Sequence, residues 1–134
     1  MDAPPVALVI NTSPDIVDML RIALERAGIV VVSTFTHQVR DGEVDFERFV
    51  AQHQPGVILY DIAPPYDRNF QLFEHIRRMP VMAGRHFVIT STNARQVERL
   101  VAASTPVYEV VGKPYDLDQI VMATREALKA KPTR

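Results

Sequence analysis

Short apolar runs alternate along the chain with stretches in which apolar residues recur every three or four positions. Runs of the first kind predict buried β-strands, and stretches of the second kind predict amphipathic helices. The clearest run is Gly56-Val-Ile-Leu-Tyr-Asp61, which is apolar at successive positions, as expected of a strand buried on both faces of a parallel sheet. The predicted strands cover residues 6–10, 29–34, 56–61, 86–91 and 107–111.

Helix start and stop signals fall between these runs. Ser13 and Pro14 suit an N-cap and a first helical position, and Gly28 ends that helix. Residues 36–44 are polar and contain Asp41-Gly42, so they predict a loop. Four further helices are predicted from their apolar faces. The second buries Phe46, Phe49, Val50 and His53 after a cap at Asp45, and the third buries Phe70, Phe73, Ile76 and Met79 and ends before Pro80. The fourth buries Val97, Leu100 and Val101 after a cap at Thr92 or Asn93, and the last runs from Leu117 to Leu128 after a capping box of Asp116 and Gln119.

Five strands alternating with five helices predict an α/β fold with a five-stranded parallel sheet, because each parallel crossover needs a helix to cover a face. Right-handed crossovers favour the flavodoxin-like doubly wound (βα)5 topology. A chain of 134 residues suits a single domain, predicted over residues 1–134 with a core at about 6–128.

Composition narrows the functional classes. The chain contains no cysteine, which excludes disulfides and thiolate metal sites. The first residues lack a basic segment leading into an apolar one, and no apolar run is long enough to span a membrane. A formal net charge of -1 disfavours sequence-independent binding to nucleic acid. We therefore expect a cytoplasmic protein that binds neither nucleic acid nor membrane.

Polar residues gather where the predicted strands end. In open parallel sheets, ligands and chemistry collect beyond the carboxyl ends of the strands. A turn-forming aspartate and a solvated lysine are the plainer interpretation of two of these residues. The residues expected at this edge are Asn11, Thr12, Asp61, Thr90, Ser91 and Lys113.

Three segments together resemble the response-regulator receiver domain of two-component signalling, of the chemotaxis type. These are residues 11–20, Asp61, and the Lys-Pro-Tyr-Asp-Leu-Asp segment at residues 113–118. The lysine-proline-aromatic turn into the last helix is the most specific of the three. The resemblance covers about residues 6–128.

This resemblance implies a role for several residues. Asp61 corresponds to the aspartate that accepts a phosphoryl group from a kinase histidine, and Lys113 to the lysine that pairs with the phosphoryl oxygens. The bond from Lys113 to Pro114 is expected to be cis, as is typical of the family. The hydroxyl that follows phosphorylation falls on Ser91 by ungapped spacing, with Thr90 as the alternative.

The chain departs from the family at its metal ligands. Receivers that use Mg²⁺ carry two acidic residues after the first strand, where this chain has Asn11 and Thr12. Each lost carboxylate removes an attraction of about 4 kcal/mol at an effective dielectric near 20. We expect weak Mg²⁺ binding, with Asp61, the Ala63 carbonyl and Asn11 as the remaining candidate ligands.

Other departures affect the switch. Val110 stands at the family's aromatic position, and Tyr108 is the nearest aromatic residue. Residues 63–66 contain two prolines where the family usually has one, Asn69 replaces a usual glycine, and extra length is expected at residues 36–44. A receiver without the metal ligands and the aromatic switch residue is expected to have stopped switching by phosphate.

The leading hypothesis is a stand-alone receiver-like signalling protein that acts by binding other proteins and is not an enzyme. The resemblance implies a sensor histidine kinase or phosphotransfer protein upstream, a downstream protein partner, and a homodimer as a further candidate assembly. The expected partner surface carries Arg95, Arg99, Tyr108, Gln119 and Lys129, although a merely solvated helix face is the plainer interpretation of each arginine taken singly.

Two alternatives come from other classes. A flavodoxin-like small-cofactor-binding protein would hold a phosphate at Thr12 and Ser13, but this loop lacks the glycine that allows close approach. A hydrolase would pair Asp61 with a histidine, and His37 is the one expected in a loop within reach.

Overall fold

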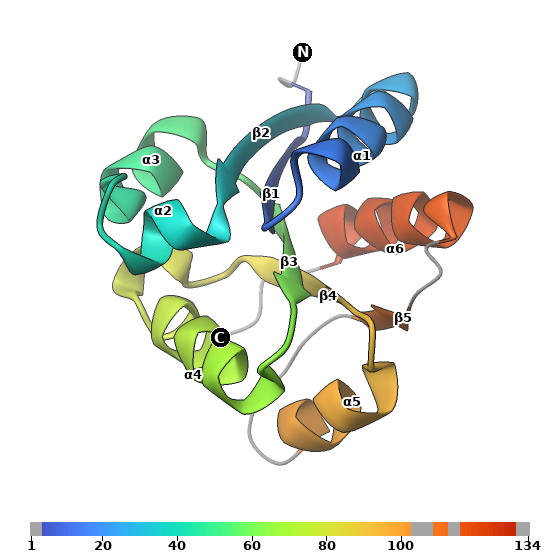
Figure 1. Cartoon of the computed structure of the whole chain (residues 1–134). Coiled ribbons are helices and arrows are strands. Elements are labelled where there is room, and N and C mark those ends of the chain that lie inside the picture. Colours follow the sequence, from blue (N-terminus) through green and yellow to red (C-terminus); the bar gives the residue numbers. More distant parts are fainter. Residues whose placement is uncertain (1–3, 103–108, 113–115, 131–134) are drawn as a thin grey trace.

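The computed structural model describes residues 4–102, 109–112 and 116–130. Its centre is a five-stranded parallel sheet in the order β2-β1-β3-β4-β5 (Figure 1). This order confirms the predicted flavodoxin-like topology. The strands are β1 (Val6–Asn11), β2 (Val30–Phe35), β3 (Val57–Ile62), β4 (His86–Ser91) and β5 (Glu109–Gly112).

Helices cover both faces of the sheet (Figure 1). On one face lie α1 (Pro14–Arg26) and α6 (Leu117–Lys129), which pack against each other and against the sheet. The other face carries α2 (Thr36–Arg40), α3 (Phe46–His53), α4 (Tyr66–Arg77), the short 3₁₀ helix η1 (Pro80–Met82) and α5 (Ala94–Ala102).

Alternation along the strands divides the core in two. Leu8 and Ile10 of β1 join the core beneath α3, α4 and α5, whereas Ala7 and Val9 join the core beneath α1 and α6. All six residues of β3 are buried, as predicted for the central strand. The carboxyl end of β3 is therefore held between two packed layers.

Most helix starts agree with the predicted caps. Gly28 adopts a positive φ of 84° just after α1. At the start of α5, Asn93 and not Thr92 provides the cap. The capping side chains accept backbone N–H groups as follows: Ser13 from Ile16, Asp45 from Arg48, Asn93 from Gln96 and Asp116 from Gln119.

Several element boundaries differ from the prediction. Residues 36–44 were expected to form a loop, but Thr36–Arg40 form α2, so the chain has a helix beyond the five predicted. Gln38 explains this, because its Oε1 accepts the N–H of Phe35 at 3.0 Å and so caps the first turn. Met79 lies beyond the end of α4 at Arg77, and the second and third strands each run one residue later than predicted. The fifth strand ends at Gly112, and its predicted start at residues 107 and 108 lies outside the described residues.

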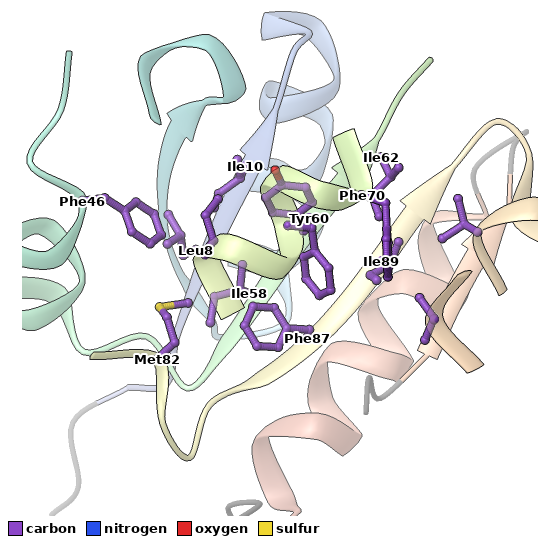
Figure 2. Close-up of a cluster of buried hydrophobic side chains, with 14 of the residues drawn as sticks. Leu8, Ile10, Phe46, Ile58, Tyr60, Ile62, Phe70, Met82, Phe87 and Ile89 are labelled. Carbon is purple, nitrogen blue, oxygen red and sulfur yellow. The ribbon is translucent and has the colours of Figure 1, made fainter. Parts of the chain in front are cut away.

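Tyr60 places a hydroxyl inside the core. Figure 2 shows this residue among the apolar side chains beneath α4, where it is fully buried. Its hydroxyl has no hydrogen-bond partner among the residues that the structure describes. Burial, and to a lesser degree the charge of Asp61, raise the pKa of Tyr60, so the group stays protonated.

Tyr60→Phe is expected to raise the free energy of unfolding by about 1 kcal/mol, because an unpaired buried hydroxyl costs about 1–3 kcal/mol. Urea denaturation of the two proteins measures the difference. Tyr66→Phe is the control, since the Tyr66 hydroxyl forms a hydrogen bond with that of Thr92 and its loss should bring no gain. A destabilised Tyr60→Phe protein would show that the hydroxyl is satisfied in solution.

Candidate functional site

Asp61 lies at the carboxyl end of the central strand and is 4% exposed. In the sheet it is paired laterally with Thr90 of β4, so the two side chains project on the same face. The Thr90 hydroxyl donates to Asp61 Oδ1 at 2.6 Å, which is at the short end of the range for O–H···O hydrogen bonds. The strand register thus joins Asp61 to one of its two predicted hydroxyl partners.

Ser91 faces the other way. It is paired with Ile62, and its Oγ donates to the Ile62 carbonyl at 2.9 Å and accepts the N–H of Asn93 at 3.2 Å. Ungapped spacing had favoured Ser91 as the hydroxyl near Asp61, with Thr90 as the alternative. In the structure, Thr90 is the one that contacts the Asp61 carboxylate.

Asn11 ends β1, the strand next to β3, and is buried. Its Oδ1 accepts the N–H of Ser13 at 3.0 Å, which turns the chain from the strand into α1. Thr12, between them, is exposed. The two positions that are acidic in metal-dependent receivers therefore hold a turn-forming amide and a solvent-facing threonine.

The loop after β3 is tied to α4. Asn69, in the first turn of α4, donates its side-chain N–H to the Ala63 carbonyl at 2.6 Å. The Pro64–Pro65 peptide bond in this loop is cis. Neither the amide donor at Asn69 nor this bond was anticipated from the sequence, where Asn69 was noted only as a substitute for glycine.

Several predicted residues lie outside the described part of the chain. Gly112, the last residue of β5, is paired with Ser91 at this same edge of the sheet. Lys113 follows it but is not among the described residues, so the predicted pair of Asp61 and Lys113 stays a prediction. The same holds for the cis bond at Pro114 and for Tyr108.

The predicted partner surface is exposed where it is described. Arg95 and Arg99 lie on the outer side of α5, and Gln119 lies in the first turn of α6. These side chains are available for contact with another protein.

The histidine proposed for a hydrolase is engaged elsewhere. His37 lies in α2, where its ring stacks on Phe35 at a centroid separation of 5.9 Å, and its Nε2 is 4.0 Å from Glu43. The cofactor-binding alternative is not favoured either. At the N-terminus of α1, Ser13 uses its N–H to bind Asn11 and its hydroxyl to cap Ile16.

Within the described ranges, no group of three or more histidine, cysteine, aspartate or glutamate side chains is arranged to hold a metal ion. None of the helices in those ranges is long and apolar enough to cross a bilayer.

No protein-family profile matches the chain. It is 25% identical over 125 residues to an uncharacterized 14.6 kDa protein in the sodA1 3' region of Leptolyngbya boryana, covering 93% of this chain and 91% of that protein.

Solved structures resemble the chain over almost its whole length. A sensor protein from Polaromonas sp. JS666 has a TM-score of 0.76 at 22% identity, covering 93% of this chain and 96% of that one. A signal receiver domain of a histidine kinase from Clostridium thermocellum has a TM-score of 0.75 at 18% identity, covering 94% of this chain and 98% of that one. A response regulator from Thermotoga maritima has a TM-score of 0.74 at 14% identity, covering 96% of this chain and 100% of that one. The chain therefore has the fold of the response-regulator receiver domains.

Proposed function

We propose that the protein is a receiver-like module of two-component signal transduction that acts by binding other proteins and not as an enzyme. The observation that carries the proposal is the position of Asp61. Its buried carboxylate lies at the carboxyl edge of the central strand of a receiver fold and accepts a hydrogen bond from Thr90. This edge is where open parallel sheets place their chemistry.

Asp61 is the proposed phosphoacceptor. A carboxylate oxygen attacks the phosphorus of a phosphohistidine, the P–O bond forms as the P–N bond breaks, and the imidazole nitrogen keeps the electron pair and takes up a proton. The Thr90 hydroxyl is close enough to redirect its hydrogen bond to a new phosphoryl oxygen. Lys113 remains a proposed contact of that group, and Ser91 would have to give up its bond to the Ile62 carbonyl to become one.

The residues at this edge fit Mg²⁺ poorly, and we propose a weakened metal site. Mg²⁺ favours an octahedral set of oxygens that includes carboxylates. The candidate set here has a single carboxylate, at Asp61, beside the Asn11 amide and the Ala63 carbonyl. Each of these three groups already accepts a hydrogen bond, from Thr90, Ser13 and Asn69 respectively. No step above depends on the ion.

The proposed partners follow from the receiver role. A sensor histidine kinase or phosphotransfer protein would act upstream, in the cytoplasm, and a downstream protein or a second copy would bind the outer side of α5 and α6. The exposed Arg95, Arg99 and Gln119 support this choice of surface.

Treatment with excess acetyl phosphate is expected to add the mass of one phosphoryl group slowly to the wild-type protein, at Asp61. Intact mass followed by peptide mapping measures the adduct. Asp61→Asn should abolish it, whereas the matched variant Asp67→Asn, an exposed position in the first turn of α4, should leave it unchanged.

The possible outcomes separate the parts of the proposal. No adduct, or an adduct at another residue, would contradict the role of Asp61. A rapid stoichiometric adduct that requires Mg²⁺ would contradict the weakened metal site and leave the phosphoacceptor in place.

A further inference from the structure

One edge of the sheet is formed by β2, whose outer side pairs with no other strand in the described residues 4–102, 109–112 and 116–130. The N–H of Val30 donates to the Pro5 carbonyl at 2.8 Å, which sets the register of the ladder with β1. Alternate residues of a parallel strand bond to the same neighbour, so the backbone groups of Val31, Ser33 and Phe35 point away from the sheet. An edge of this kind is a template for a further strand.

Side chains from two helices occupy this edge. Arg21 of α1 donates from Nη1 to the Val31 carbonyl at 2.9 Å and from Nη2 to Ser33 Oγ at 3.0 Å. At the other end, Gln38 of α2 accepts the outward N–H of Phe35 at 3.0 Å. The middle of the edge, around the Ser33 peptide groups, lies between these two side chains.

The strand itself favours pairing. Its sequence, Val-Val-Val-Ser-Thr-Phe, has high β-propensity and contains no charge, proline or glycine, which is the composition typical of self-pairing segments. Val30, the first residue of the strand, is 43% exposed. A hollow of about 330 Å³ adjoins the amino-terminal end of the edge, beside Arg21. Space and apolar surface for a second strand are therefore present.

We propose that the Arg21 side chain prevents β2 from pairing with β2 of a second copy of this chain. Two identical strands placed antiparallel about a two-fold axis present complementary backbone groups to each other, so the edge fits its own copy. The Arg21 guanidinium occupies the Val31 carbonyl that such a pair would need, and its charge would be buried against its symmetry mate. This role is independent of Asp61 and of phosphorylation.

The test is the oligomeric state of Arg21→Met, measured by sedimentation velocity from low micromolar to submillimolar concentration. Methionine keeps much of the length of the arginine side chain but cannot donate hydrogen bonds. We expect self-association at least about tenfold tighter than in the wild type, a change of about 1.4 kcal/mol. Arg26→Ala, also in the last turns of α1 and exposed, removes the same charge and should behave as the wild type.

A second substitution identifies the surface. Adding Ser33→Pro to Arg21→Met removes an outward N–H without removing a bond to β1, so it should restore the wild-type association. Arg21→Ala is the second variant should Arg21→Met fail to fold, with circular dichroism as the check of folding. A folded variant that associates no more tightly than the wild type would overturn the proposal, as would association that survives Ser33→Pro.

Discussion

Phe73→Ala is expected to lower the free energy of unfolding by about 3–5 kcal/mol, the usual cost of removing a fully buried phenylalanine. Phe73 is 0% exposed and lies where α4 meets β3 and β4. Its ring centroid is 5.2 Å from that of Tyr60, 6.0 Å from that of Phe70 and 5.1 Å from that of Phe87, the last in an edge-on arrangement. Alanine would leave a cavity among three other rings, of which Tyr60 and Phe87 belong to the sheet and Phe70 to α4.

Urea denaturation followed by circular dichroism measures this loss. Phe49→Ala is the matched control, because Phe49 is only partly buried on α3. Its ring centroid lies 4.5 Å from that of His53. We expect Phe49→Ala to cost less than half as much. Equal losses at the two positions would show that Phe73 does not lie at the centre of this core.

The double variant Asn11→Asp/Thr12→Asp is expected to tighten Mg²⁺ binding by about 100-fold. Two added carboxylates beside Asp61 each contribute about 4 kcal/mol of attraction at an effective dielectric near 20, and desolvation offsets more than half of this. Without the ion, three neighbouring carboxylates repel one another, so the double variant should also be less stable than the wild type until Mg²⁺ is added.

Isothermal titration with Mg²⁺ measures the affinity, and thermal unfolding with and without the ion measures the coupled stability. Adding Asp61→Asn to the double variant is the control and should remove most of the gain, because it deletes the central carboxylate. If affinity does not rise, the hydrogen bond from Asn69 to the Ala63 carbonyl, and not the missing acids, is what limits the site.

The strands were predictable because burial on both faces leaves continuous apolar runs. Predicted strand 86–91 agrees residue for residue with β4, and the position of Asp61 at a strand end followed from the same pattern. The short helix α2 was not predictable from periodicity, since Val39 is its one apolar residue and its first turn depends on the side chain of Gln38. A loop and a short polar helix share the same composition.

Contacts between elements were harder to anticipate. Ungapped spacing counts residues along the chain, whereas lateral pairing decides which side chain projects beside Asp61, and that pairing selects Thr90. The bond from Arg21 to the edge of β2 joins segments whose relative placement exists only in the folded sheet, and the bond from Asn69 to the Ala63 carbonyl depends on how the loop after β3 turns into α4. No local sequence signal marks either of them.

The strand order also bears on how the protein is made. Ile10 of β1 pairs on one side with Thr34 and on the other with Tyr60, which is synthesised much later. While a ribosome is still translating the segment up to Tyr60, β1 can pair only with β2. Its other side stays unpaired while β2, α2 and α3 are being synthesised. In nascent chains of this protein, the apolar strand β1 therefore remains paired on one side only until β3 has been synthesised.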